Sequence, residues 1–371
     1  MRLLLISPKN RTTYNFRGDL IREIISMGHE VVVTGPNTDD VERVKALGVR
    51  FVEIPMNKNG INPFSDVKYL IRLWKLCKKE RPDVTFGYTV KPVIYGAIAA
   101  KLAGVKHKVS MVTGLGYSFT AQTTKAKILR MVVSLLYRLG FACADTVVFQ
   151  NNDDRQQLVS LRLLKQEKTR LVNGSGVDMN AFAVADFPQT TTFFMLSRLL
   201  KSKGIAEYLS ACEKVKQQYP DVRFALLGKY EYEMQDAVDK EYVEQLIERG
   251  IIERYEETND VRPYYAACSV YVLPSYREGT PRTVLEAMAM GRPIITTDAP
   301  GCRETVIDGE NGFLVPVKDA DALAEKMCYF IEQPALLKTM GEKSHTLCTE
   351  RFAIEKVNAK MLTYLNFKED N

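Results

Sequence analysis

Short apolar runs alternate with longer amphipathic stretches from the first residues of the chain onward. In the first half of the chain these runs are residues 3–6, 31–34, 51–54, 84–86, 108–112 and 146–149. A short apolar run between two amphipathic segments is typical of a strand that is buried on both faces of a parallel sheet. The alternation therefore predicts an α/β fold, in which helices cover both faces of a parallel sheet.

This pattern breaks once and then resumes. It stops after Val172, in a glycine-containing turn and a polar stretch, and starts again at Phe193. The second series of apolar runs is residues 193–196, 223–227, 270–273, 293–296 and 313–315. Since single cores seldom grow beyond ~250–300 residues, we predict two domains, residues 1–182 and 190–350. We expect both to be doubly wound, Rossmann-like domains that face an interdomain cleft.

Two glutamates, Glu278 and Glu286, follow the predicted strand 270–273. Gly279 and Pro281 predict a turn between them, and residues 282–290 predict a helix. Ligand clefts of open α/β sheets form at the carboxyl ends of strands, and the first turn of a helix offers free backbone N–H groups. The segment therefore favours a site for an oxygen-rich ligand. Two solvated glutamates on an amphipathic helix would give the same local pattern.

Charge is distributed unevenly along the chain. Residues 1–180 hold 28 Lys and Arg against 15 Asp and Glu, a net +13, which leaves 23 against 30 and a net −7 in the remainder. Basic residues gather on two predicted helices of the first half: Lys68, Arg72, Lys75, Lys78, Lys79 and Arg81 on one, and Lys125, Lys127, Arg130 and Arg138 on the other. These helices either dock on an anionic lipid surface or bury one face in the core and leave the basic face solvated.

Other partners and compartments are less favoured by the composition. No nucleic-acid motif accompanies the basic half, so we predict no nucleic-acid partner. No apolar stretch approaches the ~20 residues needed to span a bilayer, and residues 1–6 are interpreted as the first strand. The seven cysteines are scattered without metal-site spacing, which predicts free thiols in a reducing cytoplasm.

Several segments resemble one enzyme family. Glu278 and Glu286 resemble the Glu-x7-Glu signature of the retaining family 4 glycosyltransferases, which have the GT-B fold. Segment 197–204, Ser-Arg-Leu-Leu-Lys-Ser-Lys-Gly, resembles the family's arginine–lysine diphosphate clamp, and segment 308–315 its Asp-Gly-x-Asn-Gly-x-Leu-Val turn. Segments 88–96 and 112–116 are similar to a subgroup that builds bacterial surface polysaccharides. That subgroup includes N-acetylgalactosaminyl transferases acting on undecaprenyl-diphosphate sugars.

The resemblance, which extends over essentially the whole chain, implies a role for each domain. Residues 1–182 would bind the acceptor and residues 190–350 the nucleotide sugar. Residues 352–371, which include the last predicted helix, would return to the first domain.

The resemblance also implies three catalytic residues. Arg198 and Lys203 would stabilise the charge that develops on the departing diphosphate. Glu278 would lie beside the donor hexose and the reacting centre. We expect Glu278 to act electrostatically and by positioning; a covalent glycosyl intermediate on its carboxylate is the less favoured role.

The remaining donor contacts are assigned in the same way. Glu286 would accept hydrogen bonds from the ribose hydroxyls. The backbone N–H groups of Gly279, Thr280 and Arg282 would face the sugar or the diphosphate, since Pro281 has no N–H to offer.

The first domain departs from the family pattern at two places. Many relatives have a glycine pair in the first loop, whereas residues 7–18 contain only Gly18. Arg17 is predicted to contact the acceptor diphosphate, with a solvated first-turn arginine as the alternative. Many relatives also have a donor-contacting histidine where this chain has residues 88–92 and no histidine. We predict that Lys91, or else Tyr88 or Thr89, takes over that contact.

No metal or cofactor site is predicted. Asp319 and Asp321 form the one Asp-x-Asp triplet, and an N-cap of the following helix is the simpler explanation. The glycine pairs at 114–116 and 174–176 lack the full dinucleotide-binding pattern. We therefore predict catalysis without a divalent ion or a cofactor.

These inferences predict a retaining transferase that moves a sugar, expected to be an N-acetylhexosamine, from a UDP-sugar to a polyprenyl-diphosphate-linked saccharide. The enzyme would be cytoplasmic and peripheral on the inner face of the cell membrane. Two alternatives stay open: a nucleotide-sugar 2-epimerase of the same architecture, and an inactive homologue that serves as a binding subunit.

Overall fold

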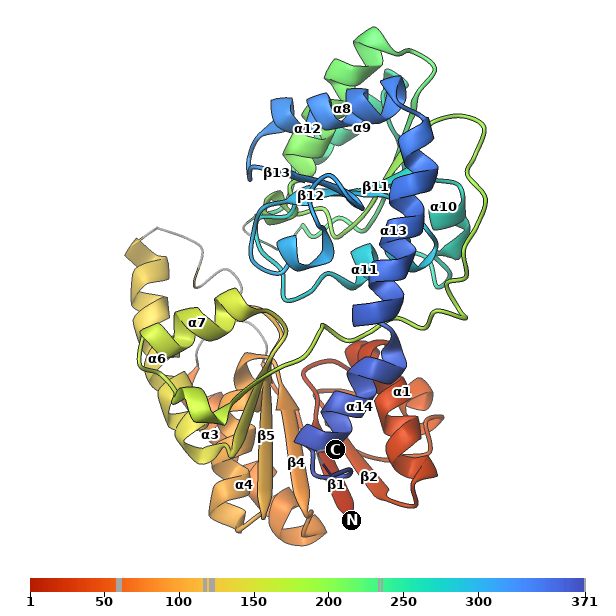
Figure 1. The fold of residues 1–371 in the computed structure, drawn as a ribbon. Coiled ribbons are helices and arrows are strands. Elements are labelled where there is room, and N and C mark those ends of the chain that lie inside the picture. The colour runs from red at the N-terminus through yellow and green to blue at the C-terminus, as the bar shows by residue number, and fades with distance from the viewer. Residues whose placement is uncertain (58–61, 116–118, 120–123, 233, 235, 370–371) are drawn as a thin grey trace. The chain divides into compact units, whose positions relative to one another are not determined.

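The chain forms two compact α/β units in a computed structural model that describes residues 1–57, 62–115, 119, 124–232, 234 and 236–369. Unit 1 comprises Met1–Ser175 and Glu355–Asn371, and unit 2 comprises Gly176–Ile354. Gly116 and the side chains of Lys125 and Lys127 lie outside what is described. Each unit is built on one parallel sheet with helices on both faces (Figure 1), so the predicted fold class of two doubly wound, Rossmann-like units is confirmed.

Unit 1 contains, within its described residues, a seven-stranded parallel sheet in the order β3-β2-β1-β4-β5-β6-β7. Its strands are β1 (Arg2–Ile6), β2 (Glu30–Gly35), β3 (Arg50–Glu53), β4 (Val84–Tyr88), β5 (His107–Val112), β6 (Thr146–Phe149) and β7 (Thr169–Leu171). Its helical segments are α1 (Asn10–Ser26), α2 (Val41–Lys45), α3 (Pro63–Glu80), the π-helix η1 (Pro92–Gly96), α4 (Ala97–Ala103), α6 (Thr124–Cys143), α7 (Asn152–Ser160), η2 (Gln166–Lys168) and α14 (Ile354–Tyr364).

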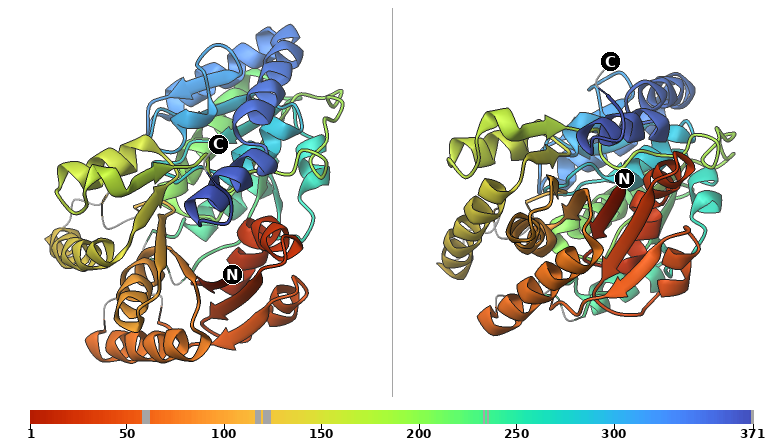
Figure 2. Two further views of the ribbon diagram at one scale, coloured as in Figure 1. Left: turned by 60° about the horizontal axis from the view of Figure 1, so that its bottom comes forward. Right: turned by 90° about the horizontal axis from the view of Figure 1, so that it is seen from below.

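The two faces of this sheet have separate cores. Side chains alternate along a strand, so Leu3 and Leu5 of β1 pack with α1 and α14 on one face. Leu4 and Ile6 pack on the other face, in the core that also contains buried side chains of α3, α4 and α6. The two helix layers are visible in Figures 1 and 2.

Unit 2 has a six-stranded parallel sheet among its described residues, in the order β10-β9-β8-β11-β12-β13. The strands are β8 (Thr192–Leu196), β9 (Arg223–Leu227), β10 (Glu253–Tyr255), β11 (Val270–Leu273), β12 (Ile294–Thr297) and β13 (Gly312–Val315). The helices are η3 (Lys201–Lys203), α8 (Ile205–Gln218), α9 (Lys240–Glu248), α10 (Arg262–Ala266), α11 (Arg282–Ala289), η4 (Arg303–Thr305), α12 (Ala320–Glu332) and α13 (Ala335–Arg351).

Two strands, β7 and β10, were not predicted. Each is three residues long and lies at an edge of its sheet. Their sequences, Thr-Arg-Leu and Glu-Arg-Tyr, carry charge and lack a continuous apolar run. Edge strands are exposed on one side and often short and charged, so the signal of a doubly covered strand is missing there.

The chain enters and leaves unit 2 at neighbouring positions. Val177, just inside the unit, pairs with Ala353 near its end as an isolated parallel bridge. The N–H of Val177 donates to the carbonyl of Phe352 at 3.0 Å, and the N–H of Ile354 donates to the carbonyl of Val177 at 3.0 Å. Beyond Ile354, the rest of α14 belongs to unit 1.

Candidate active site

The candidate active site of unit 2 lies at the point where its strand order reverses. The chain runs outward from β8 to β10 on one side and from β11 to β13 on the other, so β8 and β11 are neighbours at the switch point. Open α/β sheets bind ligands in the crevice outside the carboxyl ends of such strands. Arg198 and Lys203 follow β8 and Glu278 follows β11, which places the predicted catalytic residues around this crevice.

Close backbone approach joins the loops after β8 and β11. Gly204, between η3 and α8, has a φ of +73°, and a Cβ there would lie 2.1 Å from the carbonyl oxygen of Pro274. The N–H of Tyr276 donates to the carbonyl of Ser202 at 3.0 Å. Any side chain at Gly204 would clash with Pro274 and strain the backbone, so this glycine is required for the two loops to meet.

Lys203 and Glu278 form an ion pair across these two loops. The Lys203 ammonium lies 2.5 Å from Oε1 of Glu278, and the two side chains are 21% and 15% exposed. A charged pair at the carboxyl ends of two strands, still partly open to solvent, can exchange partners when an anion arrives. The structure thus brings together two residues that are 75 positions apart in sequence.

Arg198 is the more accessible of the two predicted clamp cations. Its side chain is 54% exposed, and its Nη1 lies 4.0 Å from Oε1 of Glu231. This distance is too long for a hydrogen bond, and an exposed contact of this kind holds a side chain only weakly. The guanidinium can therefore reorient toward a ligand at small cost.

The loop after β12 contacts the backbone of Glu278. The N–H of Glu278 donates to the carbonyl of Pro300 at 2.9 Å. Gly301 has a φ of +81°, and a Cβ there would lie 2.2 Å from the carbonyl oxygen of Glu278. This loop was not among the predicted site segments, although the Pro-Gly pair at 300–301 is a turn signal.

Glu286 is held from both sides inside α11. Its Oε1 accepts from Nε of Arg282 at 3.0 Å, and its Oε2 accepts from the hydroxyl of Tyr265 at 3.1 Å. Burial raises the pKa of the Glu286 carboxyl above its ordinary value, while Arg282 and the Tyr265 hydroxyl oppose that rise. Tyr265, on the short helix α10, is a partner of Glu286 that no sequence pattern indicated.

The turn before α11 contains the other predicted donor contacts. Gly279 and Thr280 lie between β11 and the helix, and Pro281 is the N-cap without a side-chain cap. The N-terminal turn of a helix presents backbone N–H groups and a positive dipole end that favour anions. The side chain of Arg282 is directed to Glu286, so its predicted ligand contact is the backbone N–H alone.

In unit 1, Arg17 is buried and not solvated. It lies in the third turn of α1 and is 4% exposed. Its guanidinium carbon is 5.5 Å from the centre of the Tyr88 ring, and its Nη2 is 2.8 Å from Sδ of Met111. The alternative of a solvated first-turn arginine is therefore wrong; the acceptor contact stays a prediction.

Lys91 is also buried and paired. Its ammonium lies 2.6 Å from Oδ1 of Asp66 on α3, and the two side chains are 10% and 4% exposed. The hydroxyl of Tyr95 donates to the other carboxylate oxygen at 3.2 Å, and burial, aided by Asp66, raises the pKa of Tyr95 to about 12. Lys91 thus joins η1 to α3, and its predicted contact with the donor stays a prediction.

The Asp-x-Asp triplet has the expected capping role. The Asp319 carboxylate accepts from the N–H of Ala322 and is the N-cap of α12, as predicted. Among the described residues, no group of three or more His, Cys, Asp and Glu side chains is placed to hold a metal ion. No helix in the described part of the chain has the length and apolar character to cross a bilayer.

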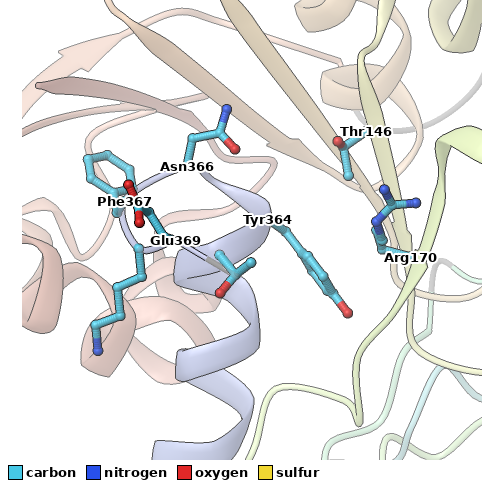
Figure 3. A pocket seen from close by; sticks show the side chains of 8 residues that line it. Thr146, Arg170, Tyr364, Asn366, Phe367 and Glu369 are labelled. Carbon is cyan, nitrogen blue, oxygen red and sulfur yellow. The ribbon is translucent and has the colours of Figure 1, made fainter. Parts of the chain in front are cut away.

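A shallow pocket in unit 1 lies away from the predicted residues (Figure 3). Thr146 and Arg170 line one side, and Tyr364, Asn366 and Phe367 of the C-terminal segment line the other. Thr146 begins β6, so the pocket opens toward the amino ends of the strands, whereas ligands of such sheets bind at the carboxyl ends. Since the Tyr364 hydroxyl donates to the carbonyl of Leu171 at 3.0 Å, we interpret these contacts as anchoring the C-terminal segment.

Family models match both halves of the chain. The model described as "Glycosyl transferases group 1" matches residues 180–346, which contain the whole candidate site. The model described as "Glycosyl transferase 4-like domain" matches residues 15–174. The chain is a GT-B glycosyltransferase. The family assignment predicted from the motifs is confirmed.

Two curated relatives of this glycosyltransferase are named for lipid-linked sugars. It is 26% identical to N,N'-diacetylbacillosaminyl-diphospho-undecaprenol alpha-1,3-N-acetylgalactosaminyltransferase of Campylobacter jejuni, over 93% of each chain. It is 29% identical to UDP-Gal:alpha-D-GlcNAc-diphosphoundecaprenol alpha-1,3-galactosyltransferase of Escherichia coli, over 87% of this chain and 84% of the relative. Both relatives are transferases, and they give no support to the epimerase hypothesis.

Solved structures share the fold. A glycosyltransferase from Rickettsia africae superimposes with a TM-score of 0.77 at 19% identity, over 100% of this chain and 99% of the other. HepE of Anabaena, solved with UDP and glucose, gives a TM-score of 0.80 at 17% identity, over 99% and 100% of the two chains. At these identities the likeness establishes the GT-B fold of the glycosyltransferase.

Proposed function

We propose that this glycosyltransferase moves an N-acetylhexosamine from a UDP-sugar to a saccharide carried on polyprenyl diphosphate, with retention of anomeric configuration, during synthesis of a bacterial surface polysaccharide or glycan. Unit 2 is the nucleotide-sugar unit and unit 1 the acceptor unit. The observation that carries the donor half is the Lys203–Glu278 pair at the β8/β11 switch point, 2.5 Å apart and partly open to solvent. The two relatives named for undecaprenyl-diphosphate-linked sugars support the acceptor half.

Departure of UDP is the step that Arg198 and Lys203 assist. As the bond between the anomeric carbon and the diphosphate oxygen breaks, negative charge grows on the diphosphate. Cations already in place stabilise that charge more than they stabilise the bound donor. Lys203 exchanges Glu278 for a phosphate oxygen, and Arg198 supplies a planar pair of donors.

Glu278 then faces the sugar. Once Lys203 has turned to the diphosphate, the Glu278 carboxylate accepts hydrogen bonds from donor-sugar hydroxyls and stabilises positive charge at the anomeric carbon. The acceptor hydroxyl attacks that carbon on the face from which UDP departs and gives its proton to the departing diphosphate oxygen. This step retains the configuration without a covalent enzyme intermediate. Glu286 holds the ribose hydroxyls, and the backbone N–H groups of Gly279, Thr280 and Arg282 face the sugar or the diphosphate.

The acceptor's lipid places the reaction at a membrane. We propose a cytoplasmic, peripheral enzyme on the anionic inner face of the cell membrane. We also propose that, in unit 1, Arg17 contacts the acceptor and Lys91 contacts the donor. Residues 1–180 carry a net charge of +13, which supports attraction to anionic lipid.

A transfer assay tests the proposal. A panel of UDP-sugars is offered with and without a short-chain polyprenyl-diphosphate N-acetylhexosamine, in the presence of EDTA. We expect UDP release that requires the acceptor, is largest for one UDP-N-acetylhexosamine and survives EDTA. UDP release only with UDP-galactose would mean that the transferred sugar is galactose. Loss of UDP release in EDTA would mean that the enzyme requires a metal ion. No UDP release with any donor would refute the proposal.

A further inference from the structure

The outward face of α3 in unit 1 is apolar along one stripe. Phe64, Val67, Ile71 and Trp74 are exposed there, Phe64 by 84%. Spacings of three, four and three residues place side chains on one side of a helix. The opposite side of α3 contains its buried residues, among them Tyr69, Leu73, Leu76 and Cys77. The stripe is therefore additional to the face that packs in the core.

A second stripe lies on α6. The exposed apolar residues of this helix are Ile128, Met131, Val132, Leu135 and Leu139, with Met131 72% exposed. Both helices contribute to the core on the same face of the unit 1 sheet, as Figure 2 also shows. The segments η1 and α4 lie between the two helices, because each of them contacts both α3 and α6. We refer to the nine side chains of the two stripes as the α3/α6 apolar face. Exposed apolar side chains that gather in this way often mark binding sites.

The charges around this face have one sign. Lys68, Arg72, Lys75 and Lys79 are exposed, and the helical period places them on the stripe next to the apolar one. The acidic residues of α3 are Asp66 and Glu80, and both are buried, paired with Lys91 and Arg50. Residues 124–143 contain no acidic residue at all. The described outer faces of α3 and α6 thus carry cations without exposed carboxylates.

The geometry points to one occupant. We propose that the α3/α6 apolar face inserts into the interfacial layer of an anionic lipid bilayer, with the flanking cations contacting lipid headgroups. Apolar and basic stripes side by side suit that environment. A second copy of this chain on the same face would bring cation against cation, which is unfavourable.

The position of this face in unit 1 also suits the proposed reaction. The inference rests on the proposed function only where it assumes a lipid-linked acceptor. Crossover helices run antiparallel to the strands they connect, so the first turns of α3 and α6 lie at the edge of the sheet that carries the carboxyl ends of its strands. Phe64 and Ile128 begin the two stripes at this edge. A lipid-linked acceptor entering there would keep its hydrocarbon chain in the bilayer while its diphosphate reaches unit 1.

The chain carries its own probe, because Trp74 is the single tryptophan and lies on this face. Full-length protein is mixed with vesicles of phosphatidylcholine, with or without phosphatidylglycerol. We expect phosphatidylglycerol vesicles to shift the Trp74 emission to shorter wavelength and to reduce its quenching by acrylamide. Phosphatidylcholine alone should give a much smaller change.

Variants separate the apolar from the basic contribution. Phe64→Ser and Ile71→Ser should each weaken partitioning into anionic vesicles on the order of tenfold and leave Trp74 in place. Lys68→Ser and Lys75→Ser should each weaken it about fivefold and make it less sensitive to salt. Val184→Ser, which removes a 61% exposed apolar side chain in unit 2, is the matched control and should change nothing.

Three outcomes would overturn the inference: no binding to anionic vesicles, binding with unchanged Trp74 fluorescence, or an emission shift that grows with protein concentration without lipid. The last would identify a second copy as the occupant. Transfer to a water-soluble, short-chain acceptor should be equal in wild type and surface variants. If the wild type does not transfer sugar to this acceptor, the result counts against the proposed function and not against the α3/α6 apolar face as a membrane contact.

Discussion

The switch points of the two sheets carry the same kind of residue in different states. At β8 and β11 of unit 2, the cations Arg198 and Lys203 are 54% and 21% exposed, and their partners are reached across loops. At β1 and β4 of unit 1, Arg17 is 4% exposed and the side chain of Lys91 is 10% exposed. Each of these two is enclosed by side chains of its own unit.

This difference separates exchangeable charges from fixed ones. Removing a partner from a buried ion pair leaves an uncompensated charge and is strongly destabilising, whereas solvent screens the charges of a more open pair and lowers that cost. We therefore expect Lys203 to exchange Glu278 for a phosphate at lower cost than Lys91 would leave Asp66. Around β1 and β4, the hydroxyls of Ser7, Thr12, Thr13 and Tyr88 form a separate neutral cluster.

The largest effect should come from the fixed pair. Lys91→Met should lower the free energy of unfolding by about 3–5 kcal/mol, because it leaves the Asp66 carboxylate buried without its counter-ion. Denaturant titration measures this. The double variant Lys91→Met with Asp66→Asn should recover most of the loss. If Lys91→Met kept full stability but lost donor affinity, Lys91 would belong with the exchangeable charges.

The exchangeable charges should affect turnover and not stability. Lys203→Ala, Arg198→Ala and Glu278→Ala should each reduce turnover on the order of 10² or more, as expected for loss of one preorganised charge. Lys201→Ala is the matched control, because Lys201 is an exposed cation in the same short helix, and it should keep near wild-type turnover. Equal losses at Lys201 and Lys203 would remove the clamp assignment.

A smaller effect is expected at Tyr265. Tyr265→Phe removes one of the two donors to Glu286 and should weaken UDP binding by about 1 kcal/mol, roughly fivefold. Tyr264→Phe, on the same helix α10, should leave affinity unchanged. Isothermal titration of UDP into each variant measures both values.

The pH dependence of UDP binding sharpens this test. In the proposed function the Glu286 carboxylate accepts from ribose hydroxyls, and it does so more strongly when ionised. Binding should therefore weaken as pH falls through the pKa of Glu286, which burial raises above its ordinary value. The Tyr265 hydrogen bond lowers that pKa. Tyr265→Phe should therefore move the acidic loss of affinity to higher pH. An unmoved profile would mean that Tyr265 acts on packing alone.

The smallest effect concerns the Asp-x-Asp triplet. Asp319→Ala should cost about 1 kcal/mol of stability through loss of the N-cap of α12. Asp321→Ala removes an 85% exposed carboxylate paired with Lys214 and should cost less than that. Thermal unfolding with and without EDTA compares the two. A large and equal loss, reproduced by EDTA, would indicate a metal site instead.

The sequence predicted that Arg198, Lys203 and Glu278 lie near one another in unit 2, because parallel strands end at a common edge of the sheet. Once 193–196 and 270–273 are recognised as strands, residues that follow them must lie close together. Pairings such as Lys91 with Asp66 and Glu286 with Tyr265 could not be predicted. The two members of these pairs are 25 and 21 residues apart and lie on different elements. No local pattern shows which buried charge meets which donor.

The paired entry and exit of unit 2 have a consequence for how such enzymes can be recombined. Because Val177 and Ala353 are bridged, unit 2 is topologically a domain inserted into unit 1, with its two ends held side by side. Insertions with adjacent ends are the kind that a host domain tolerates. Unit 2 of a relative could be grafted as one piece through these two junctions, whereas a single-junction chimera would separate α14 from the sheet face on which it packs.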